Sequence, residues 1–407
     1  MVPSLITPPP SRSGEATPAK DACLNPVNGA ETEGHWIKLP EALFSSIMAV
    51  EPEVNPLYKT SKALSDEWLK TALRMNDKTA TIWSRLDIAY MSAICAPHAD
   101  LETLKLMNDW NGWVFAFDDR KSNKQASKQA YKNRDSNILE RPAPLLHIPQ
   151  LKKVASANRT IAFDEGTFAN DPIKAAEEVI YTLATLDNIH PVVSPDENPL
   201  RHTLQSCWMR FRERSSPSLQ YRWKKHLTMY CVGVLQQVGV QHRATRPTIE
   251  EYMDMRAGCV GAYPCIGLME FAEGIDIPQY VMDHPSMQAI SRITCDLVTL
   301  QNDLCSYRKD LIQGEESNII FILKDQGMTD QQAVDQIGEM LYDCYRRWHM
   351  ALANLPFWGE GIDRDVIKFV NGCRNIALGN LHWSLYTFRY LGNDGPEVKR
   401  TRMMKLP

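Results

Sequence analysis

The sequence lacks several features that would place it in other classes of protein. None of its apolar runs approaches the roughly 18–20 residues that a membrane helix needs. Lysine and arginine number 45 against 49 acidic residues, so no excess of positive charge points to nucleic acid. The N-terminus has no basic start followed by an apolar stretch, which a secretory signal requires. We therefore expect no membrane span and no nucleic-acid partner.

Paired cysteines are also missing. The ten cysteines are scattered along the chain, and none belongs to a Cys-x-x-Cys pair. In a chain of 407 residues this pattern indicates reduced thiols in a cytoplasmic protein rather than a disulfide framework or a zinc site. Such thiols usually act as small apolar residues of a core.

Strand-like alternation is nearly absent, whereas helical periodicity covers most of the chain. Four apolar residues of segment 101–119 are spaced as one helix face, namely Leu106, Trp110, Trp113 and Phe117. Similar patterns cover about 65–95, 172–186, 201–214, 218–240, 248–272, 286–311, 317–326, 329–354 and 363–390. Hydrophobic residues make up 44% of the chain, enough for a large core. The sequence therefore predicts an all-α protein with one helical domain.

Composition divides the chain into parts. Residues 1–34 are rich in proline and small polar residues, which predicts a disordered N-terminal arm. We expect the domain to occupy 35–395 and a short C-terminal tail to follow at 396–407. Segment 121–162 does not match the rest of the domain, because it holds nine Lys or Arg residues against two acids, several prolines and little amphipathic period. A long structureless segment inside a compact domain is unusual.

One polar face carries the first candidate site. Asn302, Ser306 and Asp310 are spaced four residues apart, so on a helix their oxygen-bearing side chains line one face. Lys309 lies on the same side and Arg308 does not. Amide, hydroxyl and carboxylate oxygens suit Mg2+. The spacing alone fits a solvated polar face equally well.

Two further groups could belong to the same site. Asp118 and Asp119 end the aromatic-rich segment 101–119, where carboxylates could hold a metal above an apolar pocket or simply close an ordinary core helix. Arg256 precedes a stretch that Gly258, Gly261 and Pro264 should break or kink.

Arg389 and Tyr390 close the last long helical pattern, after Trp383. Arginine binds phosphate oxygens in pairs of hydrogen bonds, although a single arginine is more often a surface residue.

Together these residues resemble the class I terpene synthase family. The stretch NDLCSYRKD, residues 302–310, is similar to the family's second metal motif, N-D-x-x-S-x-x-x-E/D. The resemblance covers about 36–395. Phrases such as DLVTLQNDLCSYRKDL and GNLHWSLYTFRYLG look closest to fungal sesquiterpene synthases of the presilphiperfolanol, silphinene and longiborneol type.

The resemblance implies a helical bundle around an apolar active-site cavity and a role for each matching residue. Asp118, Asn302, Ser306 and Asp310 would hold three Mg2+ ions. The diphosphate of the substrate, farnesyl diphosphate by the same resemblance, would contact a basic set: Arg256, Lys309, Arg389 and Tyr390. Aromatic faces can stabilise a cation in a dry cavity. The candidates for the cavity wall are Trp110, Trp113, Phe117 and Trp383, with core packing as the alternative for at least half of them.

The first Asp-rich motif departs from the family pattern. Members read D-D-x-x-D or D-D-x-x-E, whereas Asp119 is followed by Arg-Lys-Ser-Asn. Removing 121–162 would join Asp118 and Asp119 to Asp164 and restore the motif, which is typical of an insertion such as a retained intron. The leading interpretation is a sesquiterpene cyclase. The alternatives are a catalytically impaired protein of the same fold and a prenyl-chain elongase, which would carry a second Asp-rich motif.

Overall fold

The computed structural model describes residues 35–118, 172–187, 191–241 and 246–407. These residues belong to one unit, His35–Pro407. The arm predicted at 1–34 and the insertion predicted at 121–162 lie outside the described residues.

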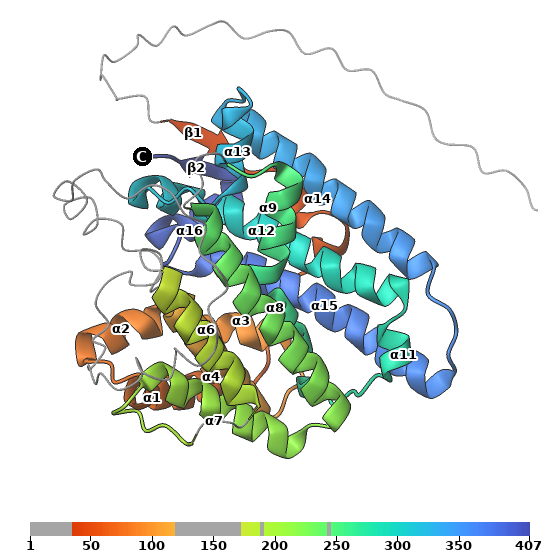
Figure 1. Cartoon of the computed structure of the whole chain (residues 1–407). Helices are drawn as coiled ribbons and strands as arrows, with labels where there is room; N and C mark the ends of the chain where they lie inside the picture. Colours follow the sequence, from red (N-terminus) through yellow and green to blue (C-terminus); the bar gives the residue numbers. More distant parts are fainter. Residues whose placement is uncertain (1–34, 119–171, 188–190, 242–245) are drawn as a thin grey trace, which may run out of the picture. The chain divides into compact units, whose positions relative to one another are not determined.

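The described residues are almost wholly helical, with two short strands and three 3-10 turns (Figure 1). In chain order the elements are β1 (Trp36–Lys38), η1 (Glu41–Phe44), η2 (Ser46–Met48), α1 (Tyr58–Ala72), α2 (Asp77–Leu86), α3 (Ile88–Cys95), α4 (Leu101–Asp118), α6 (Pro172–Leu186), α7 (Pro199–Arg214), α8 (Pro217–Gln241), α9 (Ile249–Cys259), α10 (Ala262–Ala272), α11 (Gln279–Met282), α12 (Pro285–Gln313), α13 (Ile319–Asp325), α14 (Asp330–Ala353), α15 (Glu360–Tyr386), η5 (Gly392–Asp394), α16 (Gly395–Thr401) and β2 (Met403–Lys405).

Helix α12 is the organising element of the bundle. It packs against α15, α14, α9 and α10, while α15 also packs against α3, and α8 against α9 and α10 (Figure 1). Residues at both ends of α12 determine where the helix begins and stops. His284 caps the N-terminus, Pro285 occupies the first turn, and Gly314 ends the helix with a left-handed φ of 63°. Its middle turns are buried, so polar side chains there face other protein groups or a cavity.

The expected break in 248–272 separates α9 from α10. A capping box formed by Thr248 and Glu251 starts α9, and Gly261 with a φ of 84° stands at the N-terminus of α10. This break leaves Arg256 in the last turn of α9, beside α12.

The C-terminal residues belong to the folded unit. Residues 396–407, which we set apart as a tail, lie mostly in α16 and β2, and β2 pairs antiparallel with β1 in a register that opposes Ile37 to Met404. Both of these side chains are buried, so the two ends of the described unit close over the core together. Three-residue strands are too short to produce a detectable alternation in the sequence.

The described cysteines are free thiols, and all but Cys265 are buried. This agrees with the expectation of core thiols. Within the described ranges, every helix is too short or too polar to cross a membrane.

Candidate active site

A cavity inside the bundle is lined by residues of α3, α4, α8, α9, α10, α12 and α15. Asn302, Ser306 and Asp310 all line it from one face of α12. The Ser306 hydroxyl donates a hydrogen bond to Asp310, with Oγ 2.6 Å from Oδ2. A hydroxyl that donates to a carboxylate keeps its own lone pairs for another partner. The three oxygen groups therefore form one continuous polar strip along the cavity.

Arg256 and Tyr390 hold the first residue of this strip from two sides. Arg256 Nη2 lies 3.1 Å from Asn302 Oδ1, and Asn302 Nδ2 donates to the Tyr390 hydroxyl oxygen at 2.9 Å. Because arginine only donates, these contacts fix which end of the Asn302 amide carries the oxygen. Three residues from distant parts of the sequence thus meet at the cavity.

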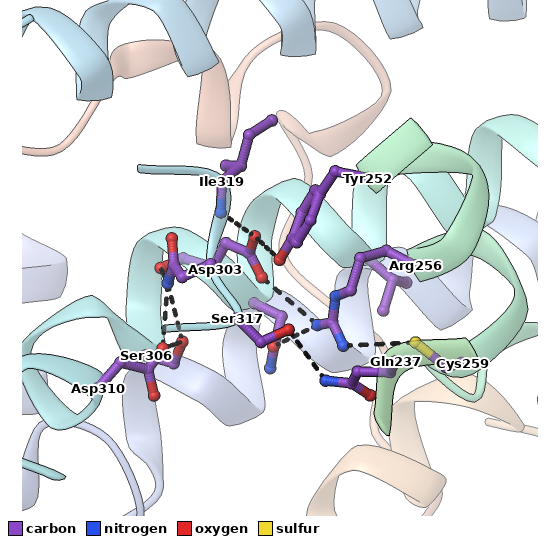
Figure 2. A network of polar contacts seen from close by, with 12 residues as sticks. Gln237, Tyr252, Arg256, Cys259, Asp303, Ser306, Asp310, Ser317 and Ile319 are labelled. Atoms are coloured by element: carbon purple, nitrogen blue, oxygen red, sulfur yellow. Dashed lines mark hydrogen bonds and ion pairs between the residues drawn. The ribbon is translucent and has the colours of Figure 1, made fainter. Parts of the chain in front are cut away.

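Asp303, the neighbour of Asn302 in the sequence, also contacts Arg256 and helps to orient it. Its Oδ2 accepts hydrogen bonds from the Tyr252 hydroxyl at 2.7 Å and from the Ile319 backbone N–H at 2.9 Å, and its Oδ1 lies 3.4 Å from Arg256 Nη2 (Figure 2). Burial raises the pKa of Asp303, while Arg256 and the hydrogen bonds act against this shift. Sequence reasoning assigned no role to Asp303, because its partners belong to α9 and to the start of α13.

The junction between α12 and α13 folds back onto the same strip. Asn318 caps α13 with its oxygen, and its Nδ2 lies 3.0 Å from Asp310 Oδ2 and 2.8 Å from the Asp303 carbonyl oxygen. One residue earlier, the Ser317 hydroxyl accepts a hydrogen bond from Gln237 of α8 at 3.0 Å (Figure 2). These contacts fix the C-terminal half of α12 to its surroundings, so Asp310 has little freedom.

The other two predicted diphosphate contacts, Lys309 and Arg389, lie on the same cavity. Lys309 Nζ is 3.4 Å from Asp310 Oδ1 and 5.7 Å from the centre of the Tyr390 ring. The Arg389 guanidinium lies 5.2 Å from the Phe115 ring centre. All four side chains, Asp310 included with Lys309, Arg389 and Tyr390, line the cavity. Arg308 is directed elsewhere, to a 2.6 Å contact with Asp394.

The position of Arg389 and Tyr390 in the chain differs from our expectation. They do not close the long helix, because α15 ends at Tyr386 and Thr387 has an extended conformation. The Thr387 hydroxyl donates to the Leu86 carbonyl oxygen at 2.9 Å, and the pair follows in the turn. Both residues line the cavity from this turn rather than from the helix itself.

The aromatic wall also differs in part from the prediction. Trp110 and Trp383 line the cavity, whereas Trp113 and Phe117 do not belong to its lining. These two stack on each other with ring centres 5.1 Å apart in the core.

Two aromatic residues that we did not select, Phe115 and Tyr230, line the cavity instead. Phe115 packs against Trp383 with ring centres 5.1 Å apart, and Trp383 donates to the Leu86 carbonyl oxygen at 2.8 Å. Helical period alone identifies a common face but not which neighbour that face meets.

The first Asp-rich motif lies at the edge of the described structure. Asp118 is the last residue of α4, and Asp119 and Asp164 lie outside the described residues. The sequence prediction for these three carboxylates therefore stays a prediction.

The donors on α12 fit a hard cation. Among the residues that the structure describes, no group of three or more His, Cys, Asp or Glu side chains could hold a metal ion. Asn302, Ser306 and Asp310 instead offer an amide oxygen, a hydroxyl and a carboxylate on one cavity wall. Such oxygen groups suit Mg2+, which keeps coordination positions for water and phosphate.

Comparison with known proteins agrees with this architecture. A solved structure of a cucumene synthase variant matches 82% of this chain and 98% of its own, with a TM-score of 0.64 at 18% identity, which shows the shared fold. The family model described as terpene synthase family 2, C-terminal metal binding, matches residues 162–347. Terpene cyclase 4 from Gibberella fujikuroi is 88% identical over 407 residues, all of both chains. The (+)-eremophilene synthase of the same organism is 36% identical over 93% of this chain and 95% of its own.

The chain belongs to family 2 of the class I terpene synthases. It is a terpene cyclase, and the prediction of an all-α fold is confirmed. The similarities do not favour the finer prediction, a presilphiperfolanol, silphinene or longiborneol type, over other fungal terpene synthases. Silphinene synthase of Penicillium patulum is 30% identical over 93% of this chain and 92% of its own, below the eremophilene synthase.

Proposed function

We propose that this cyclase is a sesquiterpene synthase, which ionises farnesyl diphosphate with Mg2+ and cyclises the carbocation to a polycyclic hydrocarbon or alcohol. One observation carries the proposal: a single cavity is lined by the oxygen groups of α12, by basic side chains and by aromatic rings. A diphosphate leaving group needs the first two, and a carbocation needs the third.

Each part of the cavity has a task in this proposal. Asn302, Ser306 and Asp310, with Asp118 from α4, would hold Mg2+, and the family resemblance implies three ions. When bound, Mg2+ supplies Lewis-acid stabilisation of the departing diphosphate. Asp119 and Asp164 are further candidate ligands.

The basic residues would act on the bond that breaks. As the carbon–oxygen bond to C1 of the prenyl chain opens, both electrons leave with the diphosphate. Arg256, Lys309 and Arg389 would donate hydrogen bonds to its oxygens as their negative charge grows, and Tyr390 would add its hydroxyl. The side chains of Trp110, Phe115 and Trp383 would surround the cation and exclude the water that would quench it.

Chain length of the substrate is the first point to test. We expect purified protein with Mg2+ to release diphosphate from farnesyl diphosphate faster than from the ten- and twenty-carbon homologues. Faster release of diphosphate from the twenty-carbon substrate would replace the assignment as a sesquiterpene synthase with that of a diterpene synthase.

A second candidate function has one observation in its favour. The first Asp-rich motif is interrupted in the sequence, so the protein could bind a prenyl diphosphate without turning it over. A prenyl-chain elongase is disfavoured, because the second motif reads Asn-Asp-x-x-Ser rather than being Asp-rich. Binding of farnesyl diphosphate without diphosphate release would favour the catalytically impaired protein. A longer prenyl diphosphate as product would favour the elongase.

A further inference from the structure

Asn380 places a polar side chain in an otherwise apolar part of the cavity wall. It lies on α15, is 7% exposed, and lines the cavity beside Ile376 and Trp383 of the same helix and Val298 of α12. Val298 is one helical turn before Asn302, so Asn380 stands about one turn from the proposed metal ligands.

The orientation of the Asn380 amide is fixed by its neighbours. Its Nδ2 donates to Gln301 Oε1 at 3.1 Å and to the Val298 carbonyl oxygen at 3.4 Å. A backbone carbonyl only accepts, so the amide cannot turn round without facing oxygen to oxygen. Gln301 is fully buried, and its own Nε2 lies 3.4 Å from the Met48 sulfur, which leaves its oxygen directed to Asn380.

The backbone of Asn380 is fixed as well. At the preceding residue, Gly379, an added Cβ would lie 2.9 Å from the Cys95 sulfur and 3.0 Å from the Met91 carbonyl oxygen. This close approach holds α15 against α3. Asn380 therefore projects from a rigid segment between α3 and α12.

These contacts use both N–H groups of the amide and leave its oxygen. Within the described part of the chain, Asn380 Oδ1 accepts no hydrogen bond, and protein atoms do not fully enclose it. Nearly all interior acceptors have a partner, so an open one at a cavity wall calls for an explanation. A ligand that carries positive charge would provide the missing interaction.

We propose that Asn380 is a specificity-determining residue of the cyclase. This inference rests on the proposed function. The negative end of the Asn380 amide dipole attracts the carbocation, holds its positive charge near the wall formed by α12 and α15, and so selects among competing ring closures.

The test replaces the amide by an apolar side chain of similar size. We expect Asn380→Leu, incubated with Mg2+ and farnesyl diphosphate, to lower the share of the main product at least about twofold, while diphosphate release falls less than about tenfold. Asn371 is exposed on the same helix, so Asn371→Leu is the matched control and should leave the product ratio unchanged.

A second variant separates orientation from packing. Gln301 does not line the cavity, and Gln301→Met removes the oxygen that holds the amide while keeping a long unbranched side chain. We expect it to shift the product ratio in the same direction as Asn380→Leu, and circular dichroism verifies that both variants are folded. Unchanged ratios in both folded variants would overturn the inference and leave the cyclase function intact. Loss of hydroxylated products alone would assign the oxygen to a bound water and also overturn it. If the unmodified protein makes no terpene, the proposed function fails instead.

Discussion

The guanidinium of Arg256 donates a hydrogen bond to the side chain of Asn302, with Nη2 3.1 Å from Oδ1. The proposed diphosphate contact and the first proposed metal ligand therefore touch directly across α9 and α12. Asp303 accepts from the same Nη2 at 3.4 Å and holds the arginine in this position. Because one cation bridges two neighbouring oxygens, its shape matters as much as its charge.

The first prediction follows from that shape. Arg256→Lys should lower kcat/KM for farnesyl diphosphate about a hundredfold, because an ammonium group cannot reproduce the planar fork of a guanidinium. Arg308→Lys is the control, since Arg308 pairs with exposed Asp394 and does not line the cavity. Similar losses at both positions, measured by diphosphate release, would contradict the assignment of Arg256.

The second prediction concerns the polar strip of α12. Asn302→Ala, Ser306→Ala and Asp310→Ala should each reduce turnover at least about a hundredfold, the scale of losing one preorganised electrostatic group. Ser306 and Asp310 are buried and accept from Asn318, so their variants should also lose about 1–3 kcal/mol of unfolding free energy.

Turnover and thermal melting are measured on the same preparations. Asp394→Ala, which removes an exposed carboxylate near the C-terminus of α15, should leave both nearly unchanged. A folded Asp310→Ala protein with near-normal activity would refute the metal role.

Parts of this site could be predicted from the sequence because they depend on one helix. Spacing alone placed Asn302, Ser306 and Asp310 on a common face, since helical geometry is fixed locally. Asp303 and Asn318 were not predicted, because their contacts join α12 to α9 and α13. The same limit applies to Phe115, which faces the cavity although Trp113 and Phe117 form the more obvious aromatic pair.

The fold shows a similar division between local and distant effects. Long helices such as α12 follow from periodicity and capping, whereas the pairing of β1 with β2 joins the two ends of the described unit. The end of α15 depends on a hydrogen bond from Thr387 to Leu86, which lies 301 residues earlier in the chain. No local pattern encodes a contact of that separation.

The third prediction concerns segment 121–162. We expect a version lacking 121–162 to cyclise farnesyl diphosphate faster than the full chain, because the deletion rejoins Asp118 and Asp119 to Asp164 at helical spacing. Loop closure costs grow only slowly with length, so both versions should fold. Sequencing the transcript tests the origin of the segment, and equal rates for the two proteins would show that it is a harmless insertion.

The fourth prediction uses the buried His382. Burial lowers the pKa of His382 to about 4, from the ordinary value of 6.5, and nearby Lys399 acts in the same direction. Between these values the unfolded chain binds more protons than the folded one, so stability is lost as the pH falls below about 6.5. His382→Gln should reduce the loss of unfolding free energy between pH 7 and pH 5 by about 1–3 kcal/mol.

Urea unfolding at the two pH values measures this effect. His349 is exposed on α14, so His349→Gln is a suitable control and should keep the pH dependence of the unmodified protein. If His382→Gln keeps it as well, His382 is not the group that titrates.

The most direct measurement of the central claim is gas chromatography of the products formed from farnesyl diphosphate by the purified chain, with Mg2+ and with excess chelator. The account predicts a cyclic sesquiterpene hydrocarbon or alcohol with Mg2+, and none once the metal is removed. Intact farnesyl diphosphate after incubation of the folded protein with Mg2+, or acyclic alcohol alone, would contradict it.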